Sequence, residues 1–295
     1  IDEMQGCASV WHPLSELTVP ADAEPLRPPM VTLHILGGRK EKIRPGDVFM
    51  MNNPFNGGTH LPDVTVITPV FDEAGKRIIY TVASRGHHAD IGGKTPGSAP
   101  PDSRVIEEEG VLIDNFQLVA QGQLRDAETR ELLASGKYPC RSIDQNMADL
   151  SAQIAANATG ATELQKITRQ FGLETVHAYM THVQDNAEES VRRVLDVLHD
   201  CSFTYPLDSG DQIKVAITVD KANRQATIDF TGTSPQNEFN YNAPLAICRA
   251  VVLYVFRTLV GSDIPMNEGC LKPLDLIVPM GSMINPQAPA AVISG

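Results

Sequence analysis

Apolar and polar residues alternate in several short stretches in the first half of the chain, which is typical of β-strands with one buried face. Apolar runs at 64–71 and 78–84 are separated by the polar loop 72–76, and this pattern predicts a β-hairpin. Residues 47–51 follow a Pro-Gly turn and predict a buried strand, and residues 110–119 predict another strand. We therefore expect the first half of the chain to be rich in β-structure.

The pattern becomes helical from about residue 144 to residue 200. Apolar residues recur at spacings of three and four over 147–154 and again over 176–198, which predicts long helices with one apolar face. Gly160 and Gly172 predict breaks between these helices.

The last third of the chain returns to mixed structure. Alternation over 213–219 and a second apolar run at 226–230 predict another hairpin, and residues 274–278 predict a final strand. The nearly unbroken apolar stretch 243–260 predicts a buried helix. Because the helices form one block and do not alternate with strands, the expected fold class is α+β with mixed, antiparallel-rich sheets.

These patterns divide the chain into four expected regions. They are an irregular N-terminal arm at 1–30, a β-rich region at 31–143, a helical block at 144–202, and an α/β region at 203–295. The chain does not begin with Met, and its last residues lie within an expected element. We therefore expect a fragment that is truncated at the C-terminal end.

Charge and composition narrow the class of partner. The 295 residues include 36 acidic and 24 basic side chains, a formal net charge of −12, which argues against nucleic acid or an anionic membrane surface as the main partner. No apolar run approaches about 18 residues, so we expect no membrane-spanning helix. With 42% hydrophobic and 20% charged residues, the composition is that of a globular protein.

The five cysteines are scattered along the chain and form no CxxC pair. An odd number of widely spaced cysteines favours neither a disulfide framework nor a thiolate zinc site. We expect reduced, buried thiols and a cytoplasmic protein.

Histidine and carboxylate residues gather on both sides of the first predicted hairpin. His60 and Asp63 form an H-x-x-D unit just before its first strand, and His87, His88 and Asp90 follow its second strand. Both groups of residues are thus expected at the open end of the hairpin.

A simple folding argument gives the expected register of this hairpin. If the chain folds about the centre of the loop near residues 73 and 74, paired positions sum to about 147, because antiparallel partners run in opposite directions. Position 60 then faces His87, and Asp63 faces Ser84. Opposite residues lie about 5 Å apart at Cα, which allows His60, Asp63 and one of the two adjacent histidines to share an ion.

Two imidazoles and a carboxylate, without thiolate, are the donor set of an open site for Mn, Fe or Zn. Such a site can lower the pKa of a bound water and polarise a carbonyl group. Since successive side chains of an extended segment point to opposite faces, only one of the adjacent histidines is expected to ligate. We assign His60, Asp63 and His88 as the metal ligands, and His87 and Asp90 as the catalytic residues.

Residues 92–95 read Gly-Gly-Lys-Thr, like the end of a phosphate-binding loop. The Walker A motif requires a glycine at position 88, where this chain has His88, and the following residues are Pro-Gly. ATP is therefore not expected to bind to this chain.

Several long stretches resemble the hydantoinase B/5-oxoprolinase (N-methylhydantoinase B-type) family. They include GDVFMMNNPFNGGTHLPDVTVITPVF at 46–71, ASRGHHADIGG at 83–93, DFTGTSPQ at 229–236 and NEGCLKP at 267–273. The resemblance extends over about 31–295, and its motifs are long and in the same order.

This resemblance implies a function in two parts. A hydantoinase A-type partner with an ATPase-like fold, either a separate subunit or a fused domain, uses ATP to phosphorylate the carbonyl oxygen of a cyclic amide. The B-type part holds a divalent metal and completes the reaction, in which water opens a hydantoin, 5-oxoproline or related lactam. Carried over residue by residue, the family's metal site also falls on His60, Asp63 and His88. The long helical block with its apolar face and the truncated C-terminal end both favour large interfaces, so we also expect a homo- or hetero-oligomer.

Two other functions stay open at this point. Related carboxylases that act on acetone or acetophenone would use the same site for carbon–carbon bond formation. A non-catalytic module would only bind an ATPase-like partner, and the His/Asp cluster would then be structural.

Overall fold

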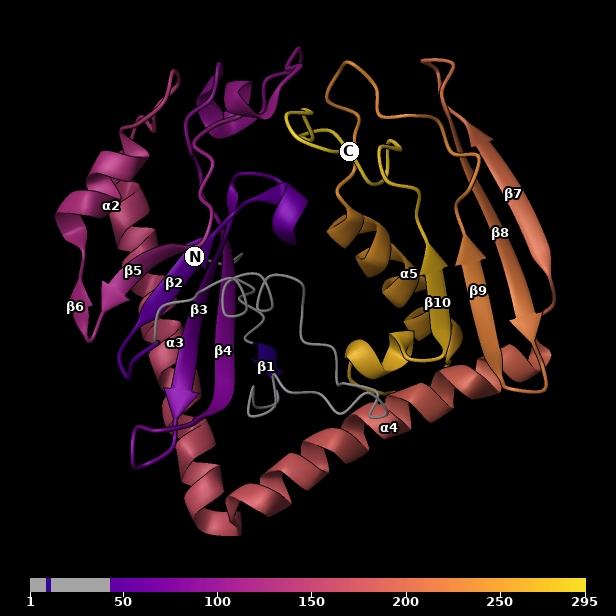
Figure 1. Ribbon diagram of the computed structural model, residues 1–295, viewed down its shortest axis with the longest axis horizontal. Coiled ribbons are helices and arrows are strands. Elements are labelled where there is room, and N and C mark those ends of the chain that lie inside the picture. Colours follow the sequence, from indigo (N-terminus) through magenta and orange to yellow (C-terminus); the bar gives the residue numbers. More distant parts are fainter. Residues whose placement is uncertain (1–8, 12–42) are drawn as a thin grey trace.

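The structure is a computed structural model that describes residues 9–11 and 43–295 (Figure 1). The predicted N-terminal arm therefore lies almost entirely outside the described residues. Two lobes, each built on its own sheet, stand side by side, and the long helix α4 (Leu173–Val197) runs beneath both. Antiparallel-rich sheets and a block of long helices confirm the predicted α+β class.

The first lobe contains a six-stranded sheet in the order β1-β4-β3-β2-β5-β6, with every neighbouring pair antiparallel. The strands are β1 (Ser9–Trp11), β2 (Val48–Met51), β3 (Asp63–Phe71), β4 (Ile78–His87), β5 (Phe116–Ala120) and β6 (Gln123–Leu124). A short helix, α2 (Asp126–Leu133), follows the last strand.

Helix α3 (Ile143–Phe171) covers one face of this sheet (Figure 1). Met147 and Leu150 of the helix pack into the main core with Val64 and Val66 of β3, all nearly inaccessible to solvent. Gln153, one helical turn farther along, donates to the carbonyl oxygen of Val64 at 2.9 Å. The helix is thus fixed to the sheet by both apolar packing and buried amide bonds.

The second lobe contains a four-stranded sheet in the order β10-β9-β8-β7. Its strands are β7 (Cys201–Pro206), β8 (Gln212–Asp220), β9 (Gln225–Asp229) and β10 (Leu274–Ile277). Helix α5 (Leu245–Leu259) contributes Val252 and Phe256 to a core that also contains Val191 and Leu195 of α4 and Ile228 of β9.

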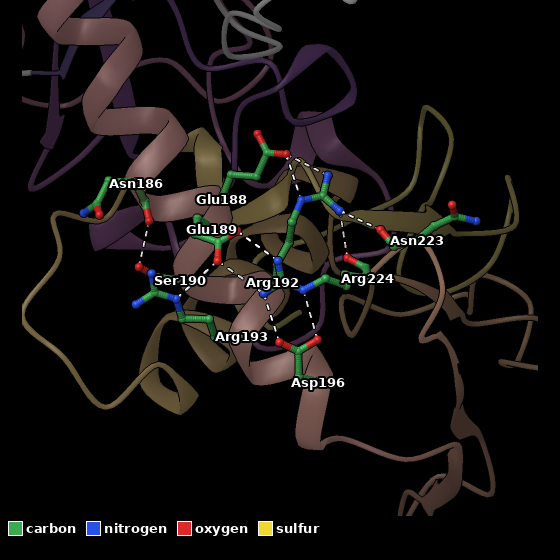
Figure 2. Close-up of polar contacts among 9 residues, drawn as sticks. All are labelled: Asn186, Glu188, Glu189, Ser190, Arg192, Arg193, Asp196, Asn223 and Arg224. Carbon is green, nitrogen blue, oxygen red and sulfur yellow. Dashed lines mark hydrogen bonds and ion pairs between the residues drawn. The ribbon is translucent and has the colours of Figure 1, made fainter.

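Polar contacts fasten α4 to the turn between β8 and β9, as Figure 2 shows. Arg192 donates to the carbonyl oxygens of Asn223 and Arg224 at 3.1 and 2.8 Å. Arg224 in turn pairs with Glu189 and Asp196 of α4 at 3.1 and 2.9 Å. These reciprocal bonds hold the C-terminal half of α4 against the second lobe.

The last described residues connect the two lobes. The backbone nitrogens of Val292 and Ile293 donate to the buried Glu109 carboxyl of the first lobe at 2.9 and 3.1 Å. From the second lobe, Asn242 donates to the carbonyl oxygen of Ala291 at 2.9 Å. This C-terminal strap, residues 289–293, therefore bonds to both lobes.

Several details differ from the sequence predictions, and α2, β1 and β6 are elements that the sequence patterns did not predict. Gly160 lies inside α3 and does not end it, whereas Gly172, with φ of 85°, separates α3 from α4 as expected. Helix α5 is not fully buried, because Tyr254 and Val251 are 62% and 55% exposed. Strand β7 was not predicted.

No helix among residues 9–11 and 43–295 is long and apolar enough to cross a membrane.

Candidate metal centre

The hairpin of β3 and β4 forms as predicted, but with a different register. Asp63 pairs with His87 and Val64 with Gly86, so paired positions sum to 150 and not to 147. The Asp72 carboxylate accepts from the backbone nitrogens of Lys76 and Arg77 at 2.8 and 3.3 Å. This turn centres the loop near residue 75, and every pair from Asp63 to Val70 is shifted by three positions, so the predicted pairing of Asp63 with Ser84 was wrong.

A tight turn brings His60 to the start of β3. The backbone nitrogen of Asp63 donates to the carbonyl oxygen of His60 at 3.1 Å. The buried Asn52 side chain, at the start of the loop between β2 and β3, donates to the carbonyl oxygen of Leu61 at 2.8 Å. This bond joins the two ends of the loop. Gly58 is needed here, because a Cβ at this position would lie 2.5 Å from the Asn52 carbonyl oxygen.

His60, Asp63 and His87 form one cluster at the open end of the hairpin, and one ligand atom from each lies within 4.8 Å of the others. Asp63 Oδ1 lies 2.9 Å from His87 Nδ1, and Asp63 Oδ2 lies 3.5 Å from His60 Nδ1. The two imidazole rings are 5.2 Å apart at their centroids. The cluster is half-open, since the side chains of His60 and Asp63 are 28% and 21% exposed and that of His87 is 62% exposed.

The surroundings of the cluster favour a neutral His60. Burial lowers the pKa of its imidazole below the ordinary value; Asp63 acts in the opposite direction, while the positive charges of His87 and Arg85 lower the pKa further. A neutral imidazole is the form that binds a metal. Thr59 donates its hydroxyl proton to Asp63 Oδ2 at 2.9 Å, which orients the carboxylate.

The structure places His87, and not His88, beside His60 and Asp63. His88 is 1% exposed and lies beneath the sheet, where Asn146 of α3 donates to its Nδ1 at 3.0 Å. The ring proton is therefore on Nε2, which donates to Gln153 Oε1 at 3.2 Å. The prediction that adjacent histidines point to opposite sides agrees with this geometry. Because β4 extends to His87, it is His87, and not His88, whose ring lies beside His60 and Asp63.

Asp90, predicted to be catalytic, does not join the cluster. Its carboxylate accepts from the backbone nitrogens of Gly92 and Gly97 at 3.0 and 3.1 Å and from the guanidinium of Arg141 at 2.7 Å. Partial burial alone would raise its pKa, but these bonds outweigh it and hold the pKa of Asp90 below the usual range. In this position the side chain shapes the loop after β4.

The sequence analysis did not identify Thr59 as part of the site, nor Asn146 and Gln153 as the partners of His88. A threonine before a histidine carries no specific signal, and the two amides lie about 60 positions from His88 along the chain. Their contacts depend on how α3 crosses the sheet, which local patterns do not encode.

The three clustered residues fit a divalent metal ion. They supply two nitrogens and one oxygen from a half-open position, which leaves room for other ligands on the solvent side. One ligand atom from each residue lies within 4.8 Å of the others, so a single ion can reach all three, whereas the 2.9 Å contact of Asp63 with His87 Nδ1 is a hydrogen bond.

A family model described as hydantoinase B/oxoprolinase matches residues 28–295. Over 279 residues the chain is 43% identical to 5-oxoprolinase 1 of Arabidopsis thaliana, covering 86% of this chain and 22% of that protein. It is also 43% identical, over 266 residues, to the 5-oxoprolinase of Saccharomyces cerevisiae, covering 86% of this chain and 21% of that protein. The chain thus spans about a fifth of the length of these relatives.

Two solved structures share the fold. The ATP-dependent caprolactamase from Pseudomonas jessenii superposes with a TM-score of 0.78 at 26% identity, covering 90% of this chain and 46% of that one. A nucleotide-free acetone carboxylase superposes with a TM-score of 0.75 at 17% identity, covering 90% of this chain and 36% of that one. At that identity the carboxylase supports the fold alone.

Proposed function

We propose, from the premise that this chain belongs to the hydantoinase B/oxoprolinase family, that it is the metal-binding component of an ATP-dependent cyclic-amide hydrolase. Its substrate class is a hydantoin, 5-oxoproline or a related lactam. The 43% identity to a 5-oxoprolinase and the 26% identity to the caprolactamase structure favour cyclic amides over the ketones of the carboxylases. The family resemblance stated above is thereby confirmed.

The observation that carries this proposal is the cluster of His60, Asp63 and His87 at the end of β3 and β4. These residues would hold the metal, with His87 in the place first assigned to His88. A divalent cation held there lowers the pKa of water and polarises an oxygen of the substrate.

The chain's own groups prepare this site. Asp63 holds His87 through the 2.9 Å contact to Nδ1, and Thr59 fixes the second carboxylate oxygen. Burial lowers the pKa of His60, which favours the neutral imidazole that a metal ion binds. An unstrained amide is a poor electrophile, which is why activation by ATP on an A-type partner belongs to the proposal. The partner, the oligomer and a cytoplasmic location are parts of the same proposal.

The test uses the full-length protein together with its A-type partner and Mn²⁺. We expect ATP-dependent opening of at least one substrate among 5-oxoproline, hydantoin and caprolactam without bicarbonate. His60→Ala and Asp63→Asn should lose the metal and at least about 100-fold in rate, since ligand loss removes the cation. His199→Ala serves as control, because His199 is exposed and lies after α4, outside the cluster.

Other outcomes would point to the alternatives. Turnover that requires bicarbonate and a ketone would replace the hydrolase by a carboxylase. If His60→Ala and Asp63→Asn both keep full activity and the purified protein contains no metal, the cluster has no catalytic role. The chain would then act only as a non-catalytic module that binds its partner.

A further inference from the structure

Arg85 lies on the same face of the hairpin as the metal cluster. Arg85 of β4 pairs with Thr65 of β3, and each lies two residues along its strand from the pair of Asp63 and His87. Residues two apart on a strand point to the same face and are separated by roughly 7 Å.

One edge of the Arg85 guanidinium is fixed, and the other is left open. Its Nε donates to Thr65 Oγ1 at 3.0 Å, and Thr65 is itself buried, with 6% exposure. Neither Nη atom bonds to any residue of the part of the chain that the structure describes. The residue is exposed by its surface area, yet the surrounding protein partly desolvates the guanidinium and lowers its pKa, so an anion bound there would be only partly screened by water. A guanidinium held in this way presents two parallel N–H donors, which is the geometry that a carboxylate or phosphate accepts.

Among residues 9–11 and 43–295, no acid forms an ion pair with Arg85. Asp63, on the same face, is shared between His60, His87 and Thr59 and exerts only a longer-range attraction on the Arg85 charge. A divalent cation on the cluster would make this end of the hairpin more positive still, in a chain with a net charge of −12. An isolated positive site of this kind attracts a small anion.

We propose that Arg85 binds an oxyanion of the substrate, a phosphoryl or carboxylate group, beside the His60–Asp63–His87 cluster. This inference deepens the proposed function and rests on it for the nature of the substrate. The open Nη edge would hold two oxygens of the anion, which places the reacting carbon next to the cluster. Arg85 would thus orient the substrate, and in a phosphorylated intermediate it would also stabilise the departing phosphate.

The test measures anion binding directly, in the full-length protein with and without Mn²⁺. Isothermal titration calorimetry with inorganic phosphate, and separately with acetate, distinguishes the two sources of oxyanion. We expect wild-type protein to bind at least one of them and Arg85→Gln to weaken that affinity by about tenfold or more. Arg85→Lys keeps the charge but loses the paired donors, so its affinity should fall between the two.

Arg77→Gln is the matched control, because Arg77 is an exposed arginine at the other end of the same hairpin. Mn²⁺ binding and circular dichroism check that each variant is folded. If Arg85→Gln does not fold, the anion affinity of Arg85→Lys provides the test. Failure of wild type to bind either anion, or equal affinity of wild type and the Arg85 variants, would overturn the inference. Arg85-dependent anion binding in a protein without hydrolase activity would contradict the proposed function alone.

Discussion

The Gln153 side chain accepts a hydrogen bond from the buried ring of His88 at 3.2 Å and donates to the Val64 carbonyl oxygen at 2.9 Å. One amide of α3 thus bonds to both strands of the hairpin that carries the candidate metal centre. The strands are held in register from below, on the face opposite His60 and His87.

Replacement of this amide should destabilise the first lobe. Gln153→Leu removes the buried acceptor of the His88 Nε2–H group and the side-chain donor to the Val64 carbonyl oxygen, at an expected cost of about 2–4 kcal/mol. Urea denaturation followed by circular dichroism measures the change. Gln170→Leu, at an exposed position of the same helix, should change stability by no more than about 0.5 kcal/mol. Equal effects of the two substitutions would contradict a specific role of Gln153.

The two adjacent histidines should separate metal binding from stability. His87→Ala is expected to weaken Mn²⁺ binding by about tenfold or more while changing stability little, because His87 is largely exposed. His88→Ala should instead cost about 2–4 kcal/mol, since it opens a cavity and removes one acceptor from the Asn146 amide and the donor to the buried Gln153 Oε1. Mn²⁺ titration by electron paramagnetic resonance and urea denaturation provide the two measurements. A stable His88→Ala protein that binds no Mn²⁺ would restore His88 as the ligand.

Glu109 should make stability depend on pH. Burial raises the pKa of its carboxyl above 4.5, although bonds from Val292, Ile293 and Ser103 act against this shift. Above pH 4.5, and up to the raised pKa, the folded state binds more protons than the unfolded chain, so the free energy of unfolding falls as the pH rises. Glu109→Gln cannot titrate and lacks this contribution.

The stability of wild type relative to Glu109→Gln should therefore decrease as the pH rises above about 4.5, until the pH passes the raised pKa of Glu109. Urea titrations of both proteins across this range give the difference directly. A difference that is constant with pH would show that Glu109 titrates alike in the folded and unfolded states.

The cysteines should differ sharply in reactivity. Burial raises the pKa of Cys140 to about 12 and that of Cys248 to about 11, while Cys201 is exposed and free. At pH 8 a disulfide reagent such as DTNB should modify Cys201 within minutes and the buried thiols far more slowly. Cys201→Ser should remove one fast-reacting thiol, and Cys140→Ser none. The reverse pattern would mean that β7 is covered in solution.

Helices and strands with a clear periodicity of apolar residues were predicted correctly, whereas the contacts between these elements were not. The period of 3.6 over 147–198 and the paired runs of the first hairpin appear in the structure as α3, α4, β3 and β4. Strand β7 was missed, because its short alternation directly follows a long helix and all six of its residues are exposed. Such a segment carries little hydrophobic signal.

The exchange of His87 and His88 shows where prediction from local pattern ends. The composition of the cluster, two histidines and Asp63, follows from the chain bringing both ends of the hairpin together. Which histidine faces it depends on the turn at Asp72, which sets the register, and on Asn146 and Gln153, which hold the second ring below the sheet. The latter contacts come from a helix far along the sequence.

The bend at Gly172 makes α3 and α4 the two arms of a bracket, with one sheet mounted on each arm. With 25 residues at 1.5 Å each, the second arm is about 37 Å long, so a rotation of 10° at the bend would displace its tip by about 6 Å. The bonds of Glu109 and Asn242 to residues 291–293 close the bracket on its open side. The two sheets are thus connected at two places, at the bend at Gly172 and at the hydrogen bonds of Glu109 and Asn242 to residues 291–293. Together these two connections fix the distance between the sheets.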